Sequence, residues 1–534
     1  MSLAPRLLRR EPTAFGRRRT RRDNHVMSLE HAPIRVPIAV DAQHGPWPLH
    51  DTAASRALEA AVLAGAAPHA LMEAAGLAVA RLALARFAPL RRVEICAGPG
   101  NNGGDGFVAA RLLHAAGIPV RVRWIGDEVR VPVDARQAMR RARDAGVAIE
   151  PWRAGTPGAD SDLVVDALLG LGAARAPEGQ IAAAIETIAA AGRPVLAVDL
   201  PSGLHGDTGQ RLGAQCVRAH ATLALLSLKP GLFTAAGRDH AGEVWFDDLG
   251  ASALAASAWL GGPPHVDWRR PADHAAHKGS QGDVVVVGGA PGMNGAAWLA
   301  ARAALAAGAG RVYASLLDAR GGTFDGGRPE LMSRLAWWRQ PPAKMAAATV
   351  VCGCGGGEMV RDALPALLAH VPRLVLDADG LNAVAGEPAL QTLLRSRAAR
   401  GLATLLTPHP LEAARLLGST SDAVQADRLA AASTLARRHC VAVLLKGSGS
   451  IVAAPHEKPT VNPTGNAALA TAGSGDVLAG WAGGLWARRP QASAFEVAAV
   501  AAWQHGDAAD RHRSAHHHGP LRAADLIEVL AAAT

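Results

Sequence analysis

Short apolar runs alternate with alanine-rich stretches along most of this chain. In the first half, runs rich in valine and leucine cover residues 91–98, 118–126, 162–170, 193–203 and 221–231. Several of them end in glycine or an acidic residue, and the stretches between them have the composition of helices. This alternation is typical of parallel sheets whose strands are joined by helices. The pattern therefore predicts an α/β unit.

The same alternation returns in the second half. Its apolar runs cover residues 282–290, 311–317, 348–357, 372–380, 402–410 and 441–453. The segment before them is rich in Ala, Gly, Pro and charged residues, and we place a domain boundary there, near Gly261. A chain of 534 residues is long enough for two such units. We predict a tail over residues 1–45, a first domain over 46–258 and a second over 262–534.

Composition narrows the class of protein. Hydrophobic residues make up 49% of the chain, but charges, histidines, prolines or glycines interrupt every stretch long enough to cross a bilayer. We therefore expect no membrane association. Five cysteines are scattered without a regular spacing, which favours a reducing compartment and a cytoplasmic location.

The net charge of +9 is concentrated at the N-terminus. Residues 1–26 hold eight arginines and two acidic residues, so six of the nine net positive charges lie there. Basic tails can bind polyanions, but this one has no interleaved aromatic residues. We expect a solvated or disordered tail and no nucleic-acid partner. Because Met27 begins a second Met-Ser-Leu, translation from that position is an alternative start.

Two glycine-rich loops are the main candidates for chemistry. GPGNNGGDGFVAAR covers residues 98–111, and NAALATAGSGDVLAG covers residues 466–480. Glycines let the backbone approach a phosphate, and the free N–H groups at a helix start bind anions. Each loop also carries an aspartate, so each is interpreted as a small nucleotide-handling site.

Two runs of the first half each contain an aspartate directly after a valine. Asp166 and Asp199 follow apolar residues, and residues 101–105 follow another run. Ligands of open parallel sheets bind beyond the carboxyl ends of the strands, so these residues are expected to converge. Aspartates at strand ends also cap helices or brace turns, and asparagines tolerate positive φ. The individual residues leave both interpretations open.

The order of the motifs resembles two known families. HALMEAAGLAVA, GPGNNGGDG, VVDALLGLG, AVDLPSGLHGDTG and LSLKPGL are similar to NAD(P)HX epimerases. HKGSQGDVVVVGG, DADGLNA, TPHP, LLKGSGS and NAALATAGSGDVLAG are similar to ADP- or ATP-dependent NAD(P)HX dehydratases, which have a ribokinase-like fold. From about residue 50 onward the chain resembles bacterial bifunctional NAD(P)H-hydrate repair enzymes, with a Rossmann-like epimerase domain followed by the ribokinase-like domain.

The resemblance implies a site in the first half. Two segments would contact the hydrated nucleotide, and Asp199 would transfer a proton during interconversion of the epimers. A potassium ion would be held by Asn102, Asp166 and Ser202, whose oxygens suit a hard cation. Arg175 is either a phosphate partner or a residue without that role. The residues of the two contacting segments are Asn101, Asn102, Gly103, Gly104 and Asp105, and Gly170, Leu171, Gly172, Ala173, Ala174, Arg175 and Ala176.

The resemblance also implies roles in the second half. Asp476 would accept the proton of the substrate hydroxyl while ADP or ATP, together with Mg²⁺, phosphorylates it. The backbone N–H groups of residues 472–475 would stabilise the transferring group. Ala296, Gly355 and His409 would contact the substrate. The adenine nucleotide would contact Lys446, Gly447, Ser448, Gly449, Ser450 and Gly475.

Some positions depart from the family pattern. Cys354 and Gly356 stand where Pro and Leu of a GPGLG motif are usual, and Leu411 follows TPHP where Gly is common. His409 between two prolines is alternatively a histidine with a purely structural role. Cys352 and Cys354 form a CxC, but no second pair at ligand spacing accompanies it, which favours buried structural residues over a metal site.

Two rival functions remain at this level. GSGD is shared across ribokinase-like proteins, so the second half is alternatively a small-alcohol or vitamin-precursor kinase. The first half is alternatively a non-catalytic binding module. The repair function predicts NADHX and NADPHX as substrates, an adenine nucleotide as co-substrate and, from the family, a homo-oligomer. The choice between ADP and ATP stays open.

Overall fold

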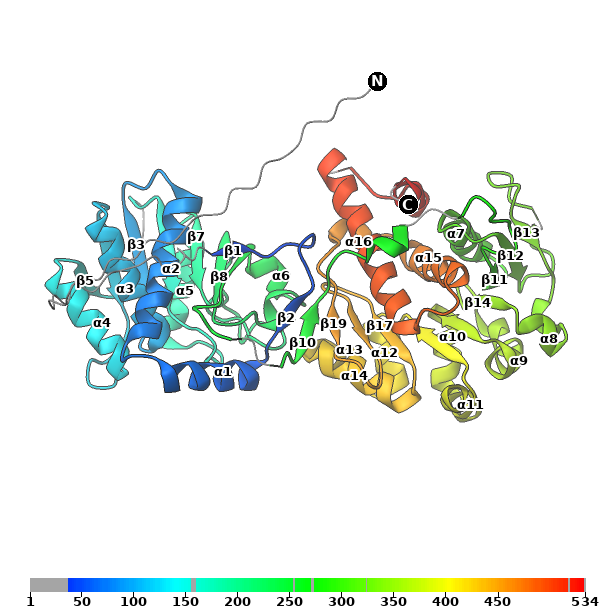
Figure 1. The fold of residues 1–534 in the computed structure, drawn as a ribbon, viewed down its shortest axis with the longest axis horizontal. Coiled ribbons are helices and arrows are strands. Elements are labelled where there is room, and N and C mark those ends of the chain that lie inside the picture. Colours follow the sequence, from blue (N-terminus) through cyan, green and yellow to red (C-terminus); the bar gives the residue numbers. More distant parts are fainter. Residues whose placement is uncertain are drawn as a thin grey trace, which may run out of the picture. The chain divides into compact units, whose positions relative to one another are not determined.

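The structure is a computed structural model that describes residues 37–154, 160–252, 255–269, 273–322, 324–516 and 519–532. Most of the predicted basic tail lies outside these residues. The described chain forms one compact unit built around two sheets. Figure 1 labels its helices and strands.

The first sheet has eight strands in the order β1-β9-β8-β7-β6-β3-β4-β5. Every pair is parallel except β1 with β9. The five apolar runs predicted in the first half contain β3, β4, β6, β7 and β8. The strands are β1 (Ile38–Ala39), β3 (Val93–Ala97), β4 (Val120–Trp124), β5 (Ala148–Pro151), β6 (Leu163–Ala167), β7 (Val195–Val198), β8 (Ala221–Leu225) and β9 (Glu243–Asp247).

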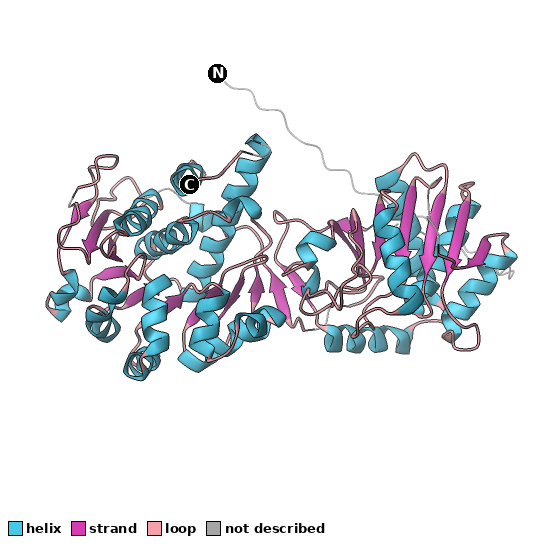
Figure 2. Ribbon diagram, turned by 180° about the vertical axis from the view of Figure 1, so that it is seen from behind, coloured by secondary structure: helices cyan, strands magenta, loops and turns pink. Residues whose placement is uncertain are grey.

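Helices cover both faces of this sheet (Figure 2). One face packs on α2, α3 and α4, and the other on α5. Successive residues of β6 show the alternation, because Val165 belongs to the first core and Val164 to the second. The helices of this half are α1 (Thr52–Gly65), α2 (Ala70–Phe87), α3 (Asn101–Ala115), α4 (Val133–Asp144), α5 (Gly179–Ala190) and α6 (Gly237–His240), with the 3₁₀ turn η1 (Pro230–Leu232).

The second sheet has eleven strands in the order β13-β12-β11-β14-β15-β16-β17-β18-β19-β10-β2. The pairs from β13 to β17 are parallel. The strands are β2 (Trp47–Leu49), β10 (Ala258–Leu260), β11 (Asp283–Gly288), β12 (Arg311–Leu316), β13 (Met332–Ser333), β14 (Ala348–Cys352), β15 (Arg373–Leu376), β16 (Ala403–Leu406), β17 (Ala442–Leu445), β18 (Ile451–Ala453) and β19 (Thr460–Val461).

This sheet is also covered on both faces. Val284 and Val286 of β11 pack with α7, α15, α16 and α17, whereas Val285 and Val287 pack with α9–α12 and α14. Buried parallel strands need apolar residues on both sides, which explains the unbroken valine run. The helices are α7 (Asn294–Ala306), α8 (Pro342–Met345), α9 (Leu364–His370), α10 (Ala378–Gly386), α11 (Pro388–Ala399), α12 (Pro410–Leu417), α13 (Ser421–Ala426), α14 (Arg428–His439), α15 (Ser474–Arg488), α16 (Ala494–His516) and α17 (Ala523–Ala531); the 3₁₀ turns are η2 (Val266–Arg269), η3 (Trp337–Arg339), η4 (Glu358–Asp362) and η5 (Ala467–Leu469).

One predicted run is divided in the structure. Residues 441–453 form β17 and β18, which pair antiparallel around the turn at residues 446–450. The expectation of a single strand in a parallel sheet is wrong here, because Gly447 and Gly449 have φ of 143° and 60° and reverse the chain. The turn places Lys446 and the following serines at the sheet edge.

The second sheet takes two strands from outside the predicted second domain. β2 pairs antiparallel with β10, and β10 pairs parallel with β19. Leu49, Ala258 and Leu260 are buried in the same core as β11. The predicted boundary near Gly261 therefore follows two strands that belong to the second sheet.

Long apolar helices are the feature that would indicate a membrane span. Among the described residues, no single helix is long and apolar enough for one. Within the part of the chain that the structure describes, only α1 and α2 taken together reach that length and composition, and they are bent by 115°.

Candidate active sites

The first site is a cavity of about 740 Å³ at the carboxyl ends of the strands of the first sheet. It is lined from the loops after β3, β6, β7 and β8, which agrees with the convergence expected for an open parallel sheet. Of the residues predicted to contact substrate, Asn101, Asn102, Asp105 and all of 170–176 line it. Asp199 lines it as well.

Gly103 and Gly104 lie in the first turn of α3 and are buried away from the cavity lining. A Cβ at Gly103 would lie 2.1 Å from Gly98 O, and one at Gly104 would lie 2.6 Å from Met72 Sδ. These glycines let the start of α3 pack closely on its surroundings. Their contribution to substrate contact is therefore confined to the backbone of the helix start.

Asp166 and Ser202 form a buried pair behind the cavity. Ser202 Oγ donates a 2.6 Å hydrogen bond to Asp166 Oδ1, and Ser202 N donates one of 2.8 Å to Oδ2. Leu169 N donates to Ser202 Oγ at 2.9 Å, which ties the pair to the loop after β6. Burial raises the pKa of Asp166 to about 6, although the hydrogen bonds from Ser202 lower it in part. The pair thus holds the loop of residues 170–176 in place.

Asn102 is the third residue predicted to bind potassium. Its side-chain Nδ2 is buried and has no hydrogen-bond partner among the described residues. A Cβ at Gly170 would lie 3.2 Å from Asn102 Oδ1, so this amide lies against the same loop as Ser202. Because the O and N of an amide are assigned from their hydrogen bonds, a 180° flip would place an oxygen acceptor at this unpartnered position.

Asp199 has an unusual backbone for an aspartate. Its φ is 69°, in the left-handed region, and its N–H donates a 2.8 Å hydrogen bond to Leu223 O. Its Oδ1 accepts hydrogen bonds from Lys229 Nζ and from Leu225 N. Asp105 lies in the same cavity, and burial, followed by the charges of Asp199 and Glu59, raises its pKa well above the usual range. The site therefore combines an ion-paired carboxylate with a carboxyl that favours its protonated form.

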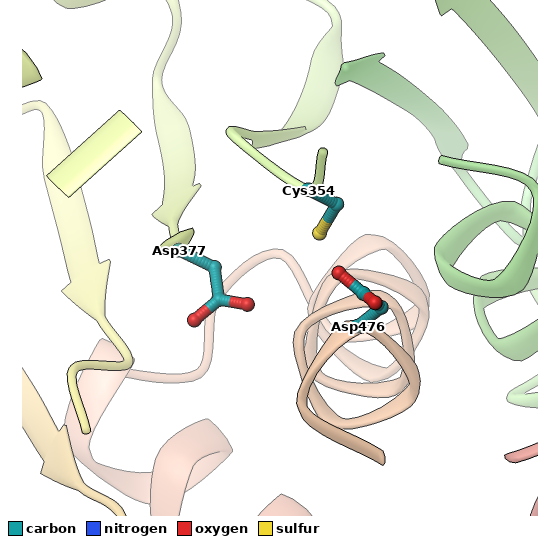
Figure 3. Close-up of side chains that lie close together, drawn as sticks. All are labelled: Cys354, Asp377 and Asp476. Atoms are coloured by element: carbon teal, nitrogen blue, oxygen red, sulfur yellow. The ribbon is translucent and has the colours of Figure 1, made fainter. Parts of the chain in front are cut away.

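The second site forms where α15, β15 and the loop after β14 meet. Figure 3 shows Asp476 at the start of α15, Asp377 at the end of β15 and Cys354 between them. The ligand atoms of these three side chains lie within 4.8 Å of one another. Asp476 is half-buried, whereas the other two are buried. Asp476 is thus accessible at a helix N-terminus and is not packed into the interior.

The surroundings of Asp476 shift its pKa upward. Burial raises the pKa to about 6, and the carboxylate of Asp377 raises it further, while a hydrogen bond from Cys354 and the charge of Lys446 lower it in part. Burial also raises the pKa of the Cys354 thiol well above its usual range. The thiol is therefore a neutral donor, and Asp476 is a carboxylate suited to accepting a proton near neutral pH.

Lys446 connects the two acidic residues to the β17–β18 turn. Its Nζ lies 2.7 Å from Asp377 Oδ1 and 4.0 Å from Glu412 Oε2. Burial lowers its pKa, but these two carboxylates outweigh that effect and raise the pKa overall. A Cβ at Gly475 would lie 3.3 Å from Lys446 Nζ. The helix start of α15 and the lysine of the turn are therefore in direct contact.

Arg428 holds the turn of residues 446–450 from beneath. Its guanidinium is buried and donates to Lys446 O, Gly449 O and Thr234 Oγ1. Burial lowers its pKa to about 10. Ser448 O accepts hydrogen bonds from Ala235 N and Thr234 Oγ1. The predicted nucleotide turn is thus packed against residues 234–235 of the first half.

Ala296 and Gly355 lie together beside this site. Gly355 has φ of 58°, and a Cβ there would lie 2.7 Å from Met293 O and 2.9 Å from the Cβ of Ala296. Any larger residue would collide with the start of α7, which explains the glycine. Gly357, which follows Gly356, also has a left-handed backbone with φ of 52°, in the loop that lacks the Pro and Leu of the expected motif.

His409 has a structural role in addition to any contact with substrate. It is the N-cap of α12, where its Nδ1 accepts hydrogen bonds from Leu411 N and Glu412 N. His409 N in turn donates a hydrogen bond to Glu412 Oε2, which completes a capping box. Nearly half of the imidazole side chain is still exposed. In this structure, Nδ1 of the His409 ring therefore caps α12.

His505 is a further buried group, and it lies behind residues 472–475, which we call the anion loop. Its Nε2 lies 3.0 Å from Ser474 O, so the ring donates to a carbonyl at the start of α15. Burial lowers its pKa to about 4, with a smaller contribution from Lys446. A neutral His505 thus braces the loop that carries Asp476.

Two family models match the chain. The YjeF-related protein N-terminus model matches residues 68–231, and the NAD(P)H-hydrate dehydratase model matches residues 284–531. The bifunctional NAD(P)H-hydrate repair enzyme Nnr of Escherichia coli (strain K12) is 34% identical over 494 residues, which are 90% of this chain and 92% of that protein. This chain belongs to the bifunctional NAD(P)H-hydrate repair enzyme family. The predicted combination of an epimerase domain and a ribokinase-like dehydratase domain is confirmed by these matches.

Other members of the repair enzyme family show similar likeness. The enzyme of Coxiella burnetii (strain RSA 493 / Nine Mile phase I) is 35% identical over 466 residues, which cover 84% of this chain and 92% of that protein. Among solved structures, an ADP/ATP-dependent NAD(P)H-hydrate dehydratase from Bacillus subtilis, co-crystallised with ATP/Mg²⁺, is 25% identical and has a TM-score of 0.39. The match covers 50% of this chain and 96% of the chain of the Bacillus subtilis structure.

Sequence reasoning left three residues of these repair-enzyme sites without a role. Asp377 was visible in DADGLNA, and Lys229 in LSLKPGL, but neither motif shows which carboxylate or ammonium its side chain will meet. His505 lies inside the long helix α16 with no local signal. Each of the three acquires its role only from contacts between segments distant in the chain.

Proposed function

We propose that this repair enzyme restores hydrated NADH and NADPH in two steps carried out at the two sites. The first site interconverts the R and S epimers of NADHX and NADPHX, and the second dehydrates the S epimer. The family supplies this pair of reactions. The placement of Asp199 in one cavity and of Asp476 at a separate helix start supports the division of labour.

In the epimerase site, Asp199 transfers a proton during the interconversion of the two epimers at the hydroxyl-bearing ring carbon. The backbone of residues 101–105 and the loop of residues 170–176 bind the nucleotide. Helix α3 begins at Asn101, so its free N–H groups suit a phosphate. The side chain of Arg175 lines the cavity and is a candidate partner for a second phosphate.

A potassium ion fits the donors near this cavity. Asn102, Asp166 and Ser202 offer amide, carboxylate and hydroxyl oxygens, which suit a hard cation. A flipped amide of Asn102 would present an unpartnered oxygen there, and this is the feature that favours a bound ion. The ion would supply positive charge beside the substrate phosphates.

In the dehydratase site, Asp476 accepts the proton of the substrate hydroxyl as the oxygen attacks the terminal phosphorus of ADP or ATP, whose bridging P–O bond breaks to release AMP or ADP. The N–H groups of residues 472–475 stabilise the charge on the transferring group. The C–O bond of the new phosphate ester then breaks, and inorganic phosphate leaves with the bonding electrons, assisted by the ring-nitrogen lone pair. Loss of a proton from the adjacent carbon restores the dihydronicotinamide.

The adenine nucleotide is placed on residues 446–450 and Gly475, and the substrate on Ala296, Gly355 and His409. Lys446 balances phosphate charge next to Asp377. Mg²⁺ prefers oxygen ligands, so the carboxylate of Asp377 suits it, whereas the thiol of Cys354 does not. The ion would neutralise charge on the phosphates during transfer. ADP and ATP both remain candidates for the donor.

We further propose a location, an oligomeric state and the domain limits of this protein. The protein acts in the cytoplasm, in keeping with five free cysteines. It forms a homo-oligomer, as the family suggests. The domain limits are those predicted, with β2 and β10 contributed to the second sheet by segments outside residues 262–534.

The observation that carries the proposal is Asp476, half-buried at the N-terminus of α15 with a pKa raised to about 6. The test supplies purified protein with each epimer of NADHX and with ADP or ATP, and follows dihydronicotinamide absorbance and inorganic phosphate. Equal amounts of NADH and phosphate are expected from both epimers. A stable phosphorylated alcohol without phosphate release would instead support a ribokinase-like kinase.

A further inference from the structure

Lys229 places a buried ammonium group beside the epimerase cavity. The residue follows β8 and η1 begins directly after it. Only 3% of its side chain is exposed, yet the residue lines the cavity with Asp199. Its Nζ donates to Asp199 Oδ1 and, at 2.8 Å, to Leu225 O. A lysine so deeply buried needs a partner for its charge, and Asp199 is that partner.

The backbone around Lys229 is anchored on both sides. Leu228 O accepts a 2.8 Å hydrogen bond from His50 N, and Gly231 N donates one of 2.7 Å to Gly206 O. A Cβ at Gly231 would lie 2.3 Å from His205 O, so this segment packs closely on the loop after β7. The backbone that carries the Lys229 ammonium is therefore held in a fixed position next to Asp199.

The two carboxylate oxygens of Asp199 differ in their contacts. Lys229 Nζ and Leu225 N both donate to Oδ1. Among the described residues, no hydrogen bond to Oδ2 accompanies them, and 13% of the side chain is exposed in the cavity. One oxygen is thus held by the protein, and the other is available to a ligand.

We propose that Lys229 is a positioning residue of the epimerase site, which holds Asp199 Oδ1 so that Oδ2 faces the ring hydroxyl of the substrate. This rests on the proposed role of Asp199 as the proton-transferring group. The left-handed backbone of Asp199 narrows the directions its short side chain can take, and the lysine selects among them. The fixed positive charge also compensates the largely buried carboxylate of Asp199.

The test compares Lys229→Met with Lys229→Arg in the full-length protein. Methionine has a similar length without the charge, and arginine keeps the charge. With R-NADHX as substrate, Lys229→Met is expected to lower epimerase kcat by about 10- to 100-fold, the range typical of losing a group that orients a working side chain. KM is expected to stay unchanged, and Lys229→Arg to recover part of kcat.

The dehydratase reaction on S-NADHX serves as the folding control in the same molecules, because it uses the other site. If Lys229→Met fails to fold, Lys229→Gln replaces it. The decisive measurement adds Lys229→Met to Asp199→Asn, where no further loss of kcat is expected because the lysine acts through the aspartate.

Three results would overturn the proposal. They are an unchanged kcat in Lys229→Met, a rise in KM alone, which would make Lys229 a phosphate contact, and full additivity with Asp199→Asn. Failure of the proposed function looks different, because Asp199→Asn itself would then keep epimerase activity.

Discussion

Lys446 Nζ donates a 2.7 Å hydrogen bond to Asp377 Oδ1, and both groups lie next to Asp476. Thr407 Oγ1 donates to the same oxygen at 2.8 Å. The two charges act on Asp476 in opposite directions, because Asp377 raises its pKa and Lys446 lowers it. The basicity of the proposed catalytic carboxylate is therefore set by a neighbouring ion pair as well as by burial.

The pH dependence of the dehydratase follows from this arrangement. A base must be deprotonated to act, and the pKa of Asp476 is about 6, so kcat is expected to fall as the pH drops below about 6. Asp377→Asn removes the charge that raises this pKa, and the acid limb of the profile should move to lower pH. Asp379→Asn, which removes a weaker contribution, should move it less. A shift to higher pH in Asp377→Asn would contradict the assignment.

Asp476→Asn tests the base directly. Loss of a general base typically lowers the rate by about 10²–10⁴-fold, and this fall is expected in dehydratase kcat. The side chain keeps its size, so nucleotide binding should persist in calorimetry. Epimerase activity in the same variant is the control, and a dehydratase that keeps most of its rate would remove Asp476 from the mechanism.

Asp199→Asn is expected to slow the use of R-NADHX strongly and to leave the use of the S epimer unaffected. The variant should still dehydrate the S epimer at the rate of the unaltered enzyme, since that reaction belongs to the other site. Mixed epimers would then yield a fast phase limited to the S fraction, followed by the slow spontaneous interconversion. Loss of both phases would indicate general damage to the fold.

The cation prediction concerns the epimerase site alone. Replacing K⁺ with Li⁺ at constant ionic strength should lower epimerase kcat/KM, because a smaller cation fits the oxygens of Asn102, Asp166 and Ser202 less well. Asn102→Ala should abolish the difference between the two salts. Dehydratase activity reports any general salt effect. Equal epimerase rates in both salts would leave the site without a cation role.

Gly473→Ala tests the strain that shapes the anion loop. Gly473 has φ of 86°, and a Cβ there would lie 2.7 Å from Leu299 Cδ1 and 2.9 Å from the Cβ of Ala523. The left-handed backbone alone costs a residue with a Cβ roughly 1–2 kcal/mol, so a lower melting temperature and lower dehydratase kcat are expected. Gly295→Ala, which meets no atom within 4 Å, is the matched control and should leave the melting temperature unchanged or raised. The same fall in both variants would argue against strain at residue 473.

Much of the architecture was predictable because buried parallel strands require apolar runs. Val284–Val287 is such a run, and it indicates a strand covered on both faces. The short strands β13 and β19 have two residues each and leave no such pattern. They exist because neighbouring strands offer free edges, which local sequence does not reveal.

The active sites were predictable where a motif fixes the backbone and unpredictable where distant segments meet. The start of α3 and that of α15 follow from their glycines. The hydrogen bond from Lys229 to Asp199 spans 30 residues, and that from Lys446 to Asp377 spans 69. Pairs at such separations depend on the packed sheet, so the sequence shows the partners without showing the pairing.

The antiparallel pairing of β2 with β10 determines where the chain can be divided without breaking the second sheet. Between Leu49 and Ala258 the polypeptide leaves the eleven-stranded sheet, builds most of the eight-stranded one and comes back beside its point of departure. Dividing the chain at Gly261 would leave β2 and β10, two strands of the second sheet, on the fragment that forms the first sheet. A separate second domain would therefore need other residues to pair with β19. A single cut between β2 and β10 would instead leave these two strands paired in the second sheet.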